Sequence, residues 1–314
     1  MRAAVYRADG ALGVEDVEAP SPGPGEVRVR VAVSGVNPTD WKARAAGAEF
    51  QVPNQDGAGV IESVGDGVDA SRVGERVWVY FAAWQRPWGT AAELCVVPAS
   101  QAVPLGDASF ELGASLGIPA LTAYHCLLAD GPIAGRTVLV HGGAGAVGHA
   151  AIELAKWAGA RVVATVSSES KGALASAAGA DAVANYRSGD YADALSAALP
   201  HGADRVVEVA LGQNLATDLE HLAPHAVISA YAATPEDMAH VPVRALMTHN
   251  ALLRFVLVYT IPRADLAAAV DGVSRAVADG ALTTLPLHRF TLDQVAEAHD
   301  AVQAGAVGKV LIDF

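Results

Sequence analysis

The sequence has little cysteine and little basic charge, and both shortages narrow the classes of protein that it can encode. It contains only two cysteines, Cys95 and Cys126, and no Cys-x-x-Cys pair, so it can build neither a disulfide framework nor a cysteine zinc site. We expect both to be small buried hydrophobic residues. Lysine and arginine number 21 against 34 acidic residues, a formal charge of −13. This charge argues against nucleic acid or an anionic membrane as a partner.

Long apolar segments are also missing. Residues 1–6 read as a strand and lack the long apolar core of a signal peptide. The least charged window, 112–129, contains Pro119 and His125, so it is a poor membrane span and a good candidate for a buried helix. With 52% hydrophobic and 18% charged residues, the composition is that of a compact chain, and its 314 residues are enough for two domains. We expect a cytoplasmic protein.

A short apolar run, 137–141, ends in glycines and passes directly into a helical pattern. Gly143, Gly145 and Gly148 match the Gly-x-Gly-x-x-Gly fingerprint, whose glycines permit a tight turn, a close approach to a pyrophosphate and close helix packing. The phosphates would lie over the helix N-terminus, which favours anions. In a chain with 31 glycines the alternative is a turn without a ligand. The βαβ unit completed by the strand 161–166 favours the dinucleotide site.

Two kinds of secondary structure divide the chain. Up to about residue 97, short strands separated by turns predict a small barrel-like β domain. From Ser109 the pattern becomes a helix over 110–130 and then alternating strands and helices, typical of a doubly wound parallel sheet. The six strands that we expect there are 137–141, 161–166, 181–184, 204–209, 226–231 and 251–258. The helices between them are 145–158, 169–178, 190–199, 213–222 and 243–249.

Five separated motifs occur along nearly the whole chain: residues 34–40, 56–61, 117–124, 143–148 and 184–187. In this combination the sequence resembles the medium-chain dehydrogenase/reductase superfamily, and within it the zinc-free quinone oxidoreductases of the zeta-crystallin type. The resemblance implies an α/β protein in which a GroES-like β domain precedes a Rossmann domain and the C-terminal tail folds back onto the first. We therefore expect the GroES-like domain at 1–112 plus 285–314, and the Rossmann domain with its six-stranded parallel sheet at 113–284.

The departures from zinc-dependent alcohol dehydrogenases are equally informative. Those relatives have a cysteine ligand where this chain has Asn37, and a Gly-His-Glu stretch where it has Asn54, Gln55 and Asp56. Zinc requires a set of thiolate, imidazole or carboxylate ligands, for which amides are poor substitutes. The four-cysteine structural loop is missing too, so we predict no metal. Without that Lewis acid, reduction of a quinone or another conjugated carbonyl is the natural chemistry.

The end of the second Rossmann strand bears on the choice of cofactor. An NAD-specific domain usually has Asp or Glu there, whereas this chain has Ser167, Ser168 and then Lys171. Hydroxyls and an ammonium can bind a phosphate, although the negative charge of Glu169 opposes phosphate binding. The alternative is that a serine caps the next helix and that Lys171 is solvated. The resemblance places serine, lysine and the tyrosine matching Tyr186 around a 2′-phosphate, so we predict NADPH. The predicted cofactor residues are Gly143, Gly145, Ala146, Val147, Gly148, Ser167, Ser168, Lys171 and Tyr186.

Three polar residues are candidates for the catalytic site. The resemblance places Thr122 near the nicotinamide, and Asn37 and Lys42 on the loop that faces it. The alternatives are a helix hydroxyl bonded to a backbone carbonyl for Thr122 and turn chemistry for Asn37 before Pro38. Relatives often carry tyrosine where Lys42 stands, so we assign no general acid; hydroquinone oxygens can take protons from solvent.

Aromatic side chains crowd one stretch, and flat aromatic walls suit a planar quinone or enone. Relatives place this stretch beside the active site, so the predicted substrate pocket is Tyr80, Phe81, Trp84 and Trp88. The alternative is a surface flap whose aromatic residues pack on the β domain. His141 reads as a strand-end residue with a satisfied ring rather than as a base, and the other histidines show no ligand spacing.

Together these residues favour an NADPH-dependent quinone reductase. The alternative within the fold is an enoyl reductase acting on an α,β-unsaturated ketone or thioester. The alternative of another class is a non-catalytic NADPH-binding protein, like the crystallins recruited from this family, and cofactor turnover separates it from the enzymes. The resemblance also implies a homodimer joined at the edge strand around 251–258, whose apolar run Arg254 interrupts. The physiological acceptor and the choice between one- and two-electron reduction stay open.

Overall fold

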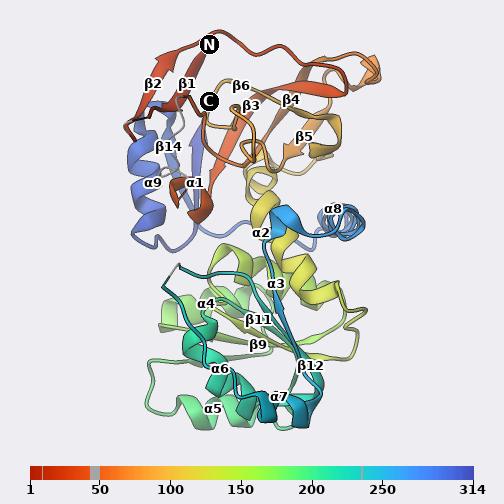
Figure 1. Ribbon diagram of the computed structural model, residues 1–314, viewed down its shortest axis with the longest axis vertical. Helices are drawn as coiled ribbons and strands as arrows, with labels where there is room; N and C mark the ends of the chain where they lie inside the picture. The colour runs from red at the N-terminus through yellow and green to blue at the C-terminus, as the bar shows by residue number, and fades with distance from the viewer. Residues whose placement is uncertain (9, 43–49, 235) are drawn as a thin grey trace. The chain divides into compact units, whose positions relative to one another are not determined.

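The computed structural model describes residues 1–8, 10–42, 50–234 and 236–314, which form two compact units (Figure 1). The first unit comprises Met1–Ile118, Val277–Asp279 and Thr284–Phe314, and the second comprises Pro119–Ala276 and Gly280–Thr283. The division after Ile118 falls inside helix α2 (Phe110–Leu128), as does the boundary expected at 112/113.

The first unit is built on a seven-stranded sheet and a separate two-stranded sheet, β1-β2. The large sheet runs in the order β14-β15-β3-β4-β5-β7, and β6 also pairs with β3. Strand β3 (Glu26–Val36) is central: its alternate residues Val27, Val29 and Val31 are buried, because a period of two places them on one face. The other strands up to residue 104 are β1 (Arg2–Tyr6), β2 (Leu12–Asp16), β4 (Asp56–Val64), β5 (Arg76–Val79), β6 (Leu94–Pro98) and β7 (Ala102–Pro104).

The end of the chain completes this unit. Strand β15 (Lys309–Asp313) pairs antiparallel with β3, and β14 (Leu287–Thr291) pairs parallel with β15. Helix α9 (Val295–Gln303) shares an apolar core with β1 and β15, to which Val5 and Val310 contribute. The C-terminal strands therefore belong to the same unit as the N-terminal ones.

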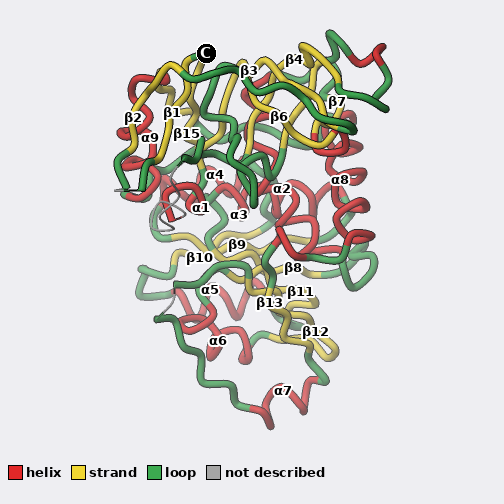
Figure 2. The backbone as a smooth tube through the Cα atoms, turned by 45° about the horizontal axis from the view of Figure 1, so that its top comes forward, coloured by secondary structure: helices red, strands yellow, loops and turns green. Residues whose placement is uncertain are grey.

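The second unit contains a six-stranded sheet of parallel strands in the order β10-β9-β8-β11-β12-β13. This confirms the predicted doubly wound sheet. Figure 2 shows α3 on one side of it and α5 and α6 on the other. The sequential order reverses between β8 and β11, and in such folds ligands bind at the carboxyl ends of the strands beside that reversal. The strands are β8 (Thr137–His141), β9 (Arg161–Val166), β10 (Ala182–Asn185), β11 (Ala203–Glu208), β12 (Leu222–Ala230) and β13 (Leu252–Phe255).

Helix α3 (Ala146–Trp157) illustrates how the sequence forms this layer. Its inner face is buried through Ala151, Ile152 and Leu154, and Gly159, with a φ of 82°, follows its last turn, as expected for a residue after a helix C-cap. The other helices of the second unit after α2 are α4 (Glu169–Ala177), α5 (Tyr191–Ala198), α6 (Leu211–Glu220), α7 (Val243–His249) and α8 (Arg263–Ala278).

Two strands differ from the prediction by more than one residue at an end. Strand β12 begins at Leu222 instead of 226, with a shift of register against β11 and a positive φ of 63° at His225. Strand β13 ends at Phe255 instead of 258, because its neighbour β12 ends at Ala230. Both cysteines are buried and free, as expected. Among the helices in the described ranges, none is long and apolar enough to cross a membrane.

Candidate active site

The glycine loop, residues 142–145, connects the carboxyl end of β8 to α3. Gly142 has a φ of 68°, a conformation that side chains rarely adopt. A Cβ at Gly148 would lie 2.2 Å from the carbonyl oxygen of Gly142, and one at Gly143 would lie 2.9 Å from Cβ of Ala164. Neither position has room for a side chain, so the fingerprint glycines here meet a real steric requirement.

Gly145 is the N-cap of α3 and offers no side chain to cap it. The N–H groups at the start of the helix, those of Ala146 and Val147 among them, therefore have no capping side chain as an acceptor. Such a helix end, approached through a loop that excludes side chains, fits the diphosphate of a dinucleotide.

The predicted 2′-phosphate residues meet at the carboxyl ends of β9 and β10. Asn185 pairs with Val166, and the N–H of Tyr186 donates to the Val166 carbonyl at 2.9 Å. Ser168 is the N-cap of α4, and its Oγ accepts the N–H of Lys171 at 3.3 Å, which is the capping alternative. Ser167 is buried, whereas Tyr186 is 50% exposed. A phosphate at this edge would meet the Tyr186 side chain at the surface.

A buried polar cluster surrounds Asn37 in the first unit. The Asn37 side chain donates through Nδ2 to Oδ2 of Asp56 at 2.6 Å, and its Oδ1 accepts from Nζ of Lys309 at 2.8 Å. Its backbone N–H donates to Oδ2 of Asp40 at 2.7 Å. Asp56 also accepts the backbone N–H of Ile118 at 2.9 Å. Each of these five residues donates or accepts a hydrogen bond, and we call the set the Asn37 cluster: Asn37, Asp40, Asp56, Ile118 and Lys309.

The Asn37 cluster holds more acid than base. Burial, reinforced by the charge of Asp56, raises the pKa of Asp40 to about 8. Burial raises the pKa of Asp56 to about 6, with Lys309 opposing the rise. Burial also lowers the pKa of Lys309, against the pull of both carboxylates. One ammonium therefore faces one carboxylate, and Asp40 keeps its proton at neutral pH.

The side chain at position 37, where related dehydrogenases place a cysteine ligand, is fully engaged in hydrogen bonds and does not fit a zinc site. The Asn37 amide is hydrogen-bonded at both ends, and the nearby positive charge is the ammonium of Lys309. Asn54 is occupied as well: it donates to Oγ of Ser34 at 2.9 Å, and its Oδ1 lies 2.9 Å from Nε2 of His299. Two hydrogen-bonded amides beside the Lys309 ammonium do not provide ligands for a divalent metal.

The other two predicted catalytic residues differ in exposure. Lys42, the last residue of α1 (Pro38–Lys42), is exposed, and its Nζ lies 5.8 Å from the Trp41 ring centroid. Thr122 belongs to the second unit, where it is buried in α2 and 5% exposed. Their roles stay predictions.

The aromatic stretch divides into an inner and an outer part. Tyr80 and Phe81 are buried, and the Tyr80 hydroxyl donates to the Ser100 carbonyl at 3.2 Å. Trp84 and Trp88 are partly exposed, and Trp88 packs edge-on against Phe50 with ring centroids 5.0 Å apart. Packing on the β domain, the alternative considered above, thus accounts for Tyr80 and Phe81 and in part for Trp88, which packs against the apolar core that contains Val52. Both tryptophans remain partly exposed.

His141 lies at the end of β8 with both ring nitrogens in contact with partners, as expected. Nδ1 lies 2.9 Å from Oγ1 of Thr165, and Nε2 lies 2.7 Å from Oδ1 of Asp218. The sequence did not point to Asp218, nor to the nearby Glu208. Glu208 had one usable signal: it follows Val206 and Val207 directly, at the carboxyl end of a Rossmann strand.

Lys309 and Asp40 were missed as well. Lys309 opens a strand whose next three residues are apolar and buried. A charge directly before a buried apolar run is the signal that could have marked it. Asp40 lies in the first turn of α1, where an acidic residue is common and draws no notice.

Comparisons with known proteins agree with this architecture. Two family models match: the alcohol dehydrogenase GroES-like domain over residues 23–107 and the zinc-binding dehydrogenase family over 146–275. The quinone oxidoreductase of Rattus norvegicus is 28% identical over 307 residues, 95% of this chain and 92% of the relative. The structure of a mycobacterial quinone oxidoreductase has a TM-score of 0.86 at 27% identity, covering 100% of both chains. A mycobacterial protein in complex with NADPH has a TM-score of 0.85 at 27% identity, again over 100% of both chains.

A GroES-like unit, a doubly wound sheet with its glycine loop, and relatives of this kind define an oxidoreductase that uses a nicotinamide cofactor. The quinone oxidoreductases are its relatives in both sequence and structure. The chain belongs to the medium-chain dehydrogenase/reductase superfamily, as its motifs predicted.

Proposed function

We propose that the protein transfers hydride from NADPH to a quinone or a similar conjugated carbonyl, without a metal. The observation that carries the proposal is the start of α3, an uncapped helix end behind glycines that admit no Cβ, which fits the diphosphate of a dinucleotide. Kinship with quinone oxidoreductases supports the choice of acceptor.

The cofactor, when bound, supplies the hydride. The N–H groups of Ala146 and Val147 would hold its diphosphate, and Lys171 with Tyr186 would hold the 2′-phosphate. The exposed faces of Trp84 and Trp88 would flank a planar acceptor. Asn37, whose amide is committed to Asp56 and Lys309, would fix the start of α1 instead of binding substrate.

The test follows reduced-nicotinamide absorbance with NADPH and NADH separately, first alone, then with a simple benzoquinone, then with a short enone. Rapid loss with NADPH and quinone supports the proposal. In the Lys171→Ala variant we expect the KM for NADPH to rise about tenfold, since one phosphate contact is lost, with little change for NADH. Lys156→Ala, near the opposite end of α3 from the glycine loop, is the matched control.

Other outcomes favour the other readings. Turnover with the enone alone supports an enoyl reductase. Binding of NADPH without turnover of any acceptor supports a non-catalytic binding protein. Equal use of NADPH and NADH contradicts the assigned role of Lys171.

We also propose a homodimer joined at β13. In the described part of the chain β13 pairs only with β12, so its outer edge is free to pair with the same strand of a second copy. Phe255 is 72% exposed and Leu257 54%, which is large for a monomer's edge. Arg254 is neutralised by Asp130 at 2.5 Å, so its charge does not prevent association. A cytoplasmic location stays a prediction.

Light scattering of the purified chain tests this interface. The wild-type protein should have the mass of two chains, and Phe255→Asp should reduce it to one. Val73→Asp, at a residue 50% exposed in the first unit, is the control and should stay dimeric. A dimeric Phe255→Asp protein would place the interface elsewhere.

A further inference from the structure

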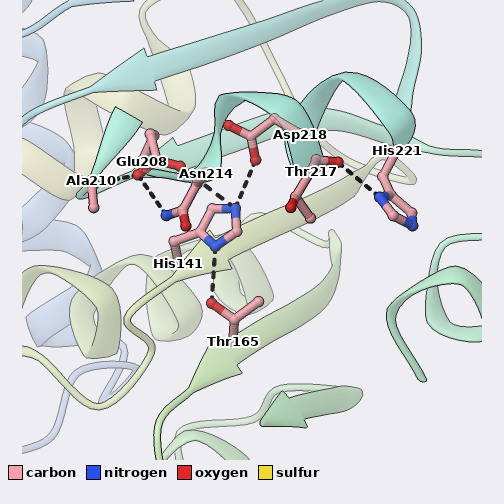
Figure 3. A network of polar contacts seen from close by, with 8 residues as sticks. All are labelled: His141, Thr165, Glu208, Ala210, Asn214, Thr217, Asp218 and His221. Carbon is pink, nitrogen blue, oxygen red and sulfur yellow. Dashed lines mark hydrogen bonds and ion pairs between the residues drawn. The ribbon is translucent and has the colours of Figure 1, made fainter. Parts of the chain in front are cut away.

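Three ionisable side chains converge beneath the carboxyl edge of the parallel sheet (Figure 3). His141 ends β8 and Glu208 ends β11, the two neighbouring strands between which the sequential order reverses. Asp218 reaches them from α6. His141 is 2% exposed and both acids are 0% exposed. We call these residues the His141 triad.

The ring of His141 is the centre of the triad. Its Nε2 lies 2.7 Å from Oδ1 of Asp218 and 3.6 Å from Oε2 of Glu208. Its Nδ1 contacts the Thr165 hydroxyl on β9. The ring thus links the ends of β8, β9 and β11 to α6, as Figure 3 shows.

Glu208 connects the triad to the loop after β11. Its Oε1 accepts the backbone N–H of Ala210 and, at 3.0 Å, Nδ2 of Asn214 on α6. The neighbouring Val209 lies against the glycine loop, because a Cβ at Gly142 would be 3.4 Å from its Cγ1. The loops that follow β8 and β11 therefore begin one residue from the triad and lie next to each other.

With a neutral ring and both acids ionised, the triad would hold two buried negative charges and no positive one. Oε2 of Glu208 and Oδ2 of Asp218 are buried without a hydrogen-bond partner. Among the described residues, no Lys or Arg makes an ion pair with either acid. The other titratable groups that face them, Tyr191 on α5 and Tyr231 after β12, are acids whose pKa burial raises, so they stay neutral. Burial raises the pKa of Glu208, the charge of His141 opposes this rise, and the charge of Asp218 adds to it. An ionised carboxylate pair here therefore depends on an imidazolium.

We propose that the His141 triad is a proton-dependent positioning element for the dinucleotide site: a protonated His141 holds the loops after β8 and β11 in the geometry that binds the cofactor. This inference rests on the proposed binding of NADPH. None of the three residues touches solvent appreciably, so they act through the backbone that they hold, and not by contact with the ligand.

Loss of the proton has two consequences of the same sign. It leaves both carboxylates beside a neutral ring, which loosens the link between β8 and β11, and it adds negative charge beneath the site for an anionic diphosphate. Although burial alone would lower it, the hydrogen bond and charge of Asp218, with the charge of Glu208, raise the pKa of His141. Cofactor affinity should therefore fall as pH rises through this elevated pKa.

The test measures the Kd of NADPH by its fluorescence with the full chain, at intervals between about pH 7 and pH 9.5, a range above the usual histidine pKa. In the wild-type protein the Kd should rise about tenfold, the equivalent of a shift of one pKa unit. His141→Gln should be flat across this range. His221→Gln, a nearby histidine bonded to Ser196 and Thr217 instead of the triad, should keep the wild-type slope.

Each result decides a separate point. A wild-type protein that binds NADPH at no pH overturns the proposed function and this inference together. Binding with the same pH dependence in wild type and His141→Gln overturns only the inference. A loss of slope in His221→Gln as well assigns the effect to general loosening and overturns it too.

If His141→Gln fails to fold, histidine NMR of the wild-type protein tests the proposal instead, by measuring the pKa of His141 with and without NADPH. Coupling is reciprocal, so saturating NADPH should raise the pKa of His141 by about one unit if protonation tightens binding about tenfold. An unchanged pKa overturns the proposal. Titration with Zn²⁺ alone is the second check, because the three ligand atoms lie within 4.8 Å of one another. Stoichiometric zinc binding that abolishes the His141 titration would overturn the role of the proton.

Discussion

Lys309 donates a hydrogen bond through Nζ to Oδ1 of Asn37 at 2.8 Å, across 272 positions of sequence. At its other end the same amide donates to Asp56 at 2.6 Å. One amide thus bridges a buried cation and a buried anion, and both of its ends serve the fold. Asn37 is conspicuous in the sequence because of what relatives carry there, yet its contacts are those of a structural residue.

Replacing Lys309 by Met should destabilise the protein strongly. The variant leaves the Asp56 carboxylate buried without its cation, which typically costs about 3–5 kcal/mol. The double variant Lys309→Met with Asp56→Asn should recover much of that loss. Lys42→Met, at an exposed lysine, should change stability by less than about 0.5 kcal/mol. Urea unfolding measures all four proteins, and a Lys309→Met protein as stable as Lys42→Met would contradict the buried pairing.

Stability should decline as pH rises toward about 8 because of Asp40. Its pKa is raised to about 8 by burial, against about 3.9 in an unfolded chain. Between these values the folded state holds a proton that the unfolded state releases, so its stabilising effect is complete at low pH and disappears on crossing about pH 8. The limit is about 1.4 kcal/mol per pH unit for one proton. Asp40→Asn should flatten this slope; equal slopes in urea unfolding at several pH values would exclude Asp40 as the source.

Ser168 can be tested as a cap and as a phosphate contact in one series. Ser168→Ala should lose about 1 kcal/mol of stability, since the N-cap of α4 is removed. Ser168→Asp keeps a good N-cap but places a carboxylate where the 2′-phosphate is proposed. It should therefore retain stability while the Kd for NADPH rises about tenfold or more, with NADH little affected. If both cofactors bind Ser168→Asp as they bind the wild type, Ser168 is a cap and nothing else.

Gly148→Ala should disturb the glycine loop directly. The new Cβ would lie 2.2 Å from the Gly142 carbonyl oxygen, so the loop or the start of α3 must move. We expect the free energy of unfolding to fall by about 1–3 kcal/mol, as is typical of a core clash. The melting temperature should fall accordingly, and the affinity for NADPH should weaken. Gly189→Ala, where a Cβ meets nothing within 4 Å, is the control. An unaffected Gly148→Ala protein would remove the steric argument for this glycine.

The sequence predicted the parallel strands of the second unit well, because these strands follow from patterns among residues close together in the chain. Apolar runs separated by helical periodicity gave all six parallel strands, and glycine spacing located the turn after β8. Strand limits were weaker where a partner decides them. The outermost strand, β13, stops at Phe255 with its neighbour β12, although apolar residues such as Val256 continue beyond it.

The buried charges escaped prediction for a different reason. Glu208 and Asp218 become a unit only through His141, and the contact between His141 and Asp218 spans 77 positions of sequence. Asp40 and Lys309 lie at opposite ends of the chain. A single charged residue looks solvated until its partner is known, and no local pattern specifies a partner that the fold brings from elsewhere.

The placement of β15 has a consequence for synthesis of the chain on the ribosome. The second unit is complete once Thr283 has emerged, whereas the first unit still lacks its last strands. Until Lys309 follows, the Asp56 carboxylate has no cation to accompany it into the interior. The first unit, although most of its strands are translated before the second unit, must therefore close after it, and the nascent chain carries the incomplete sheet until β15 has been made.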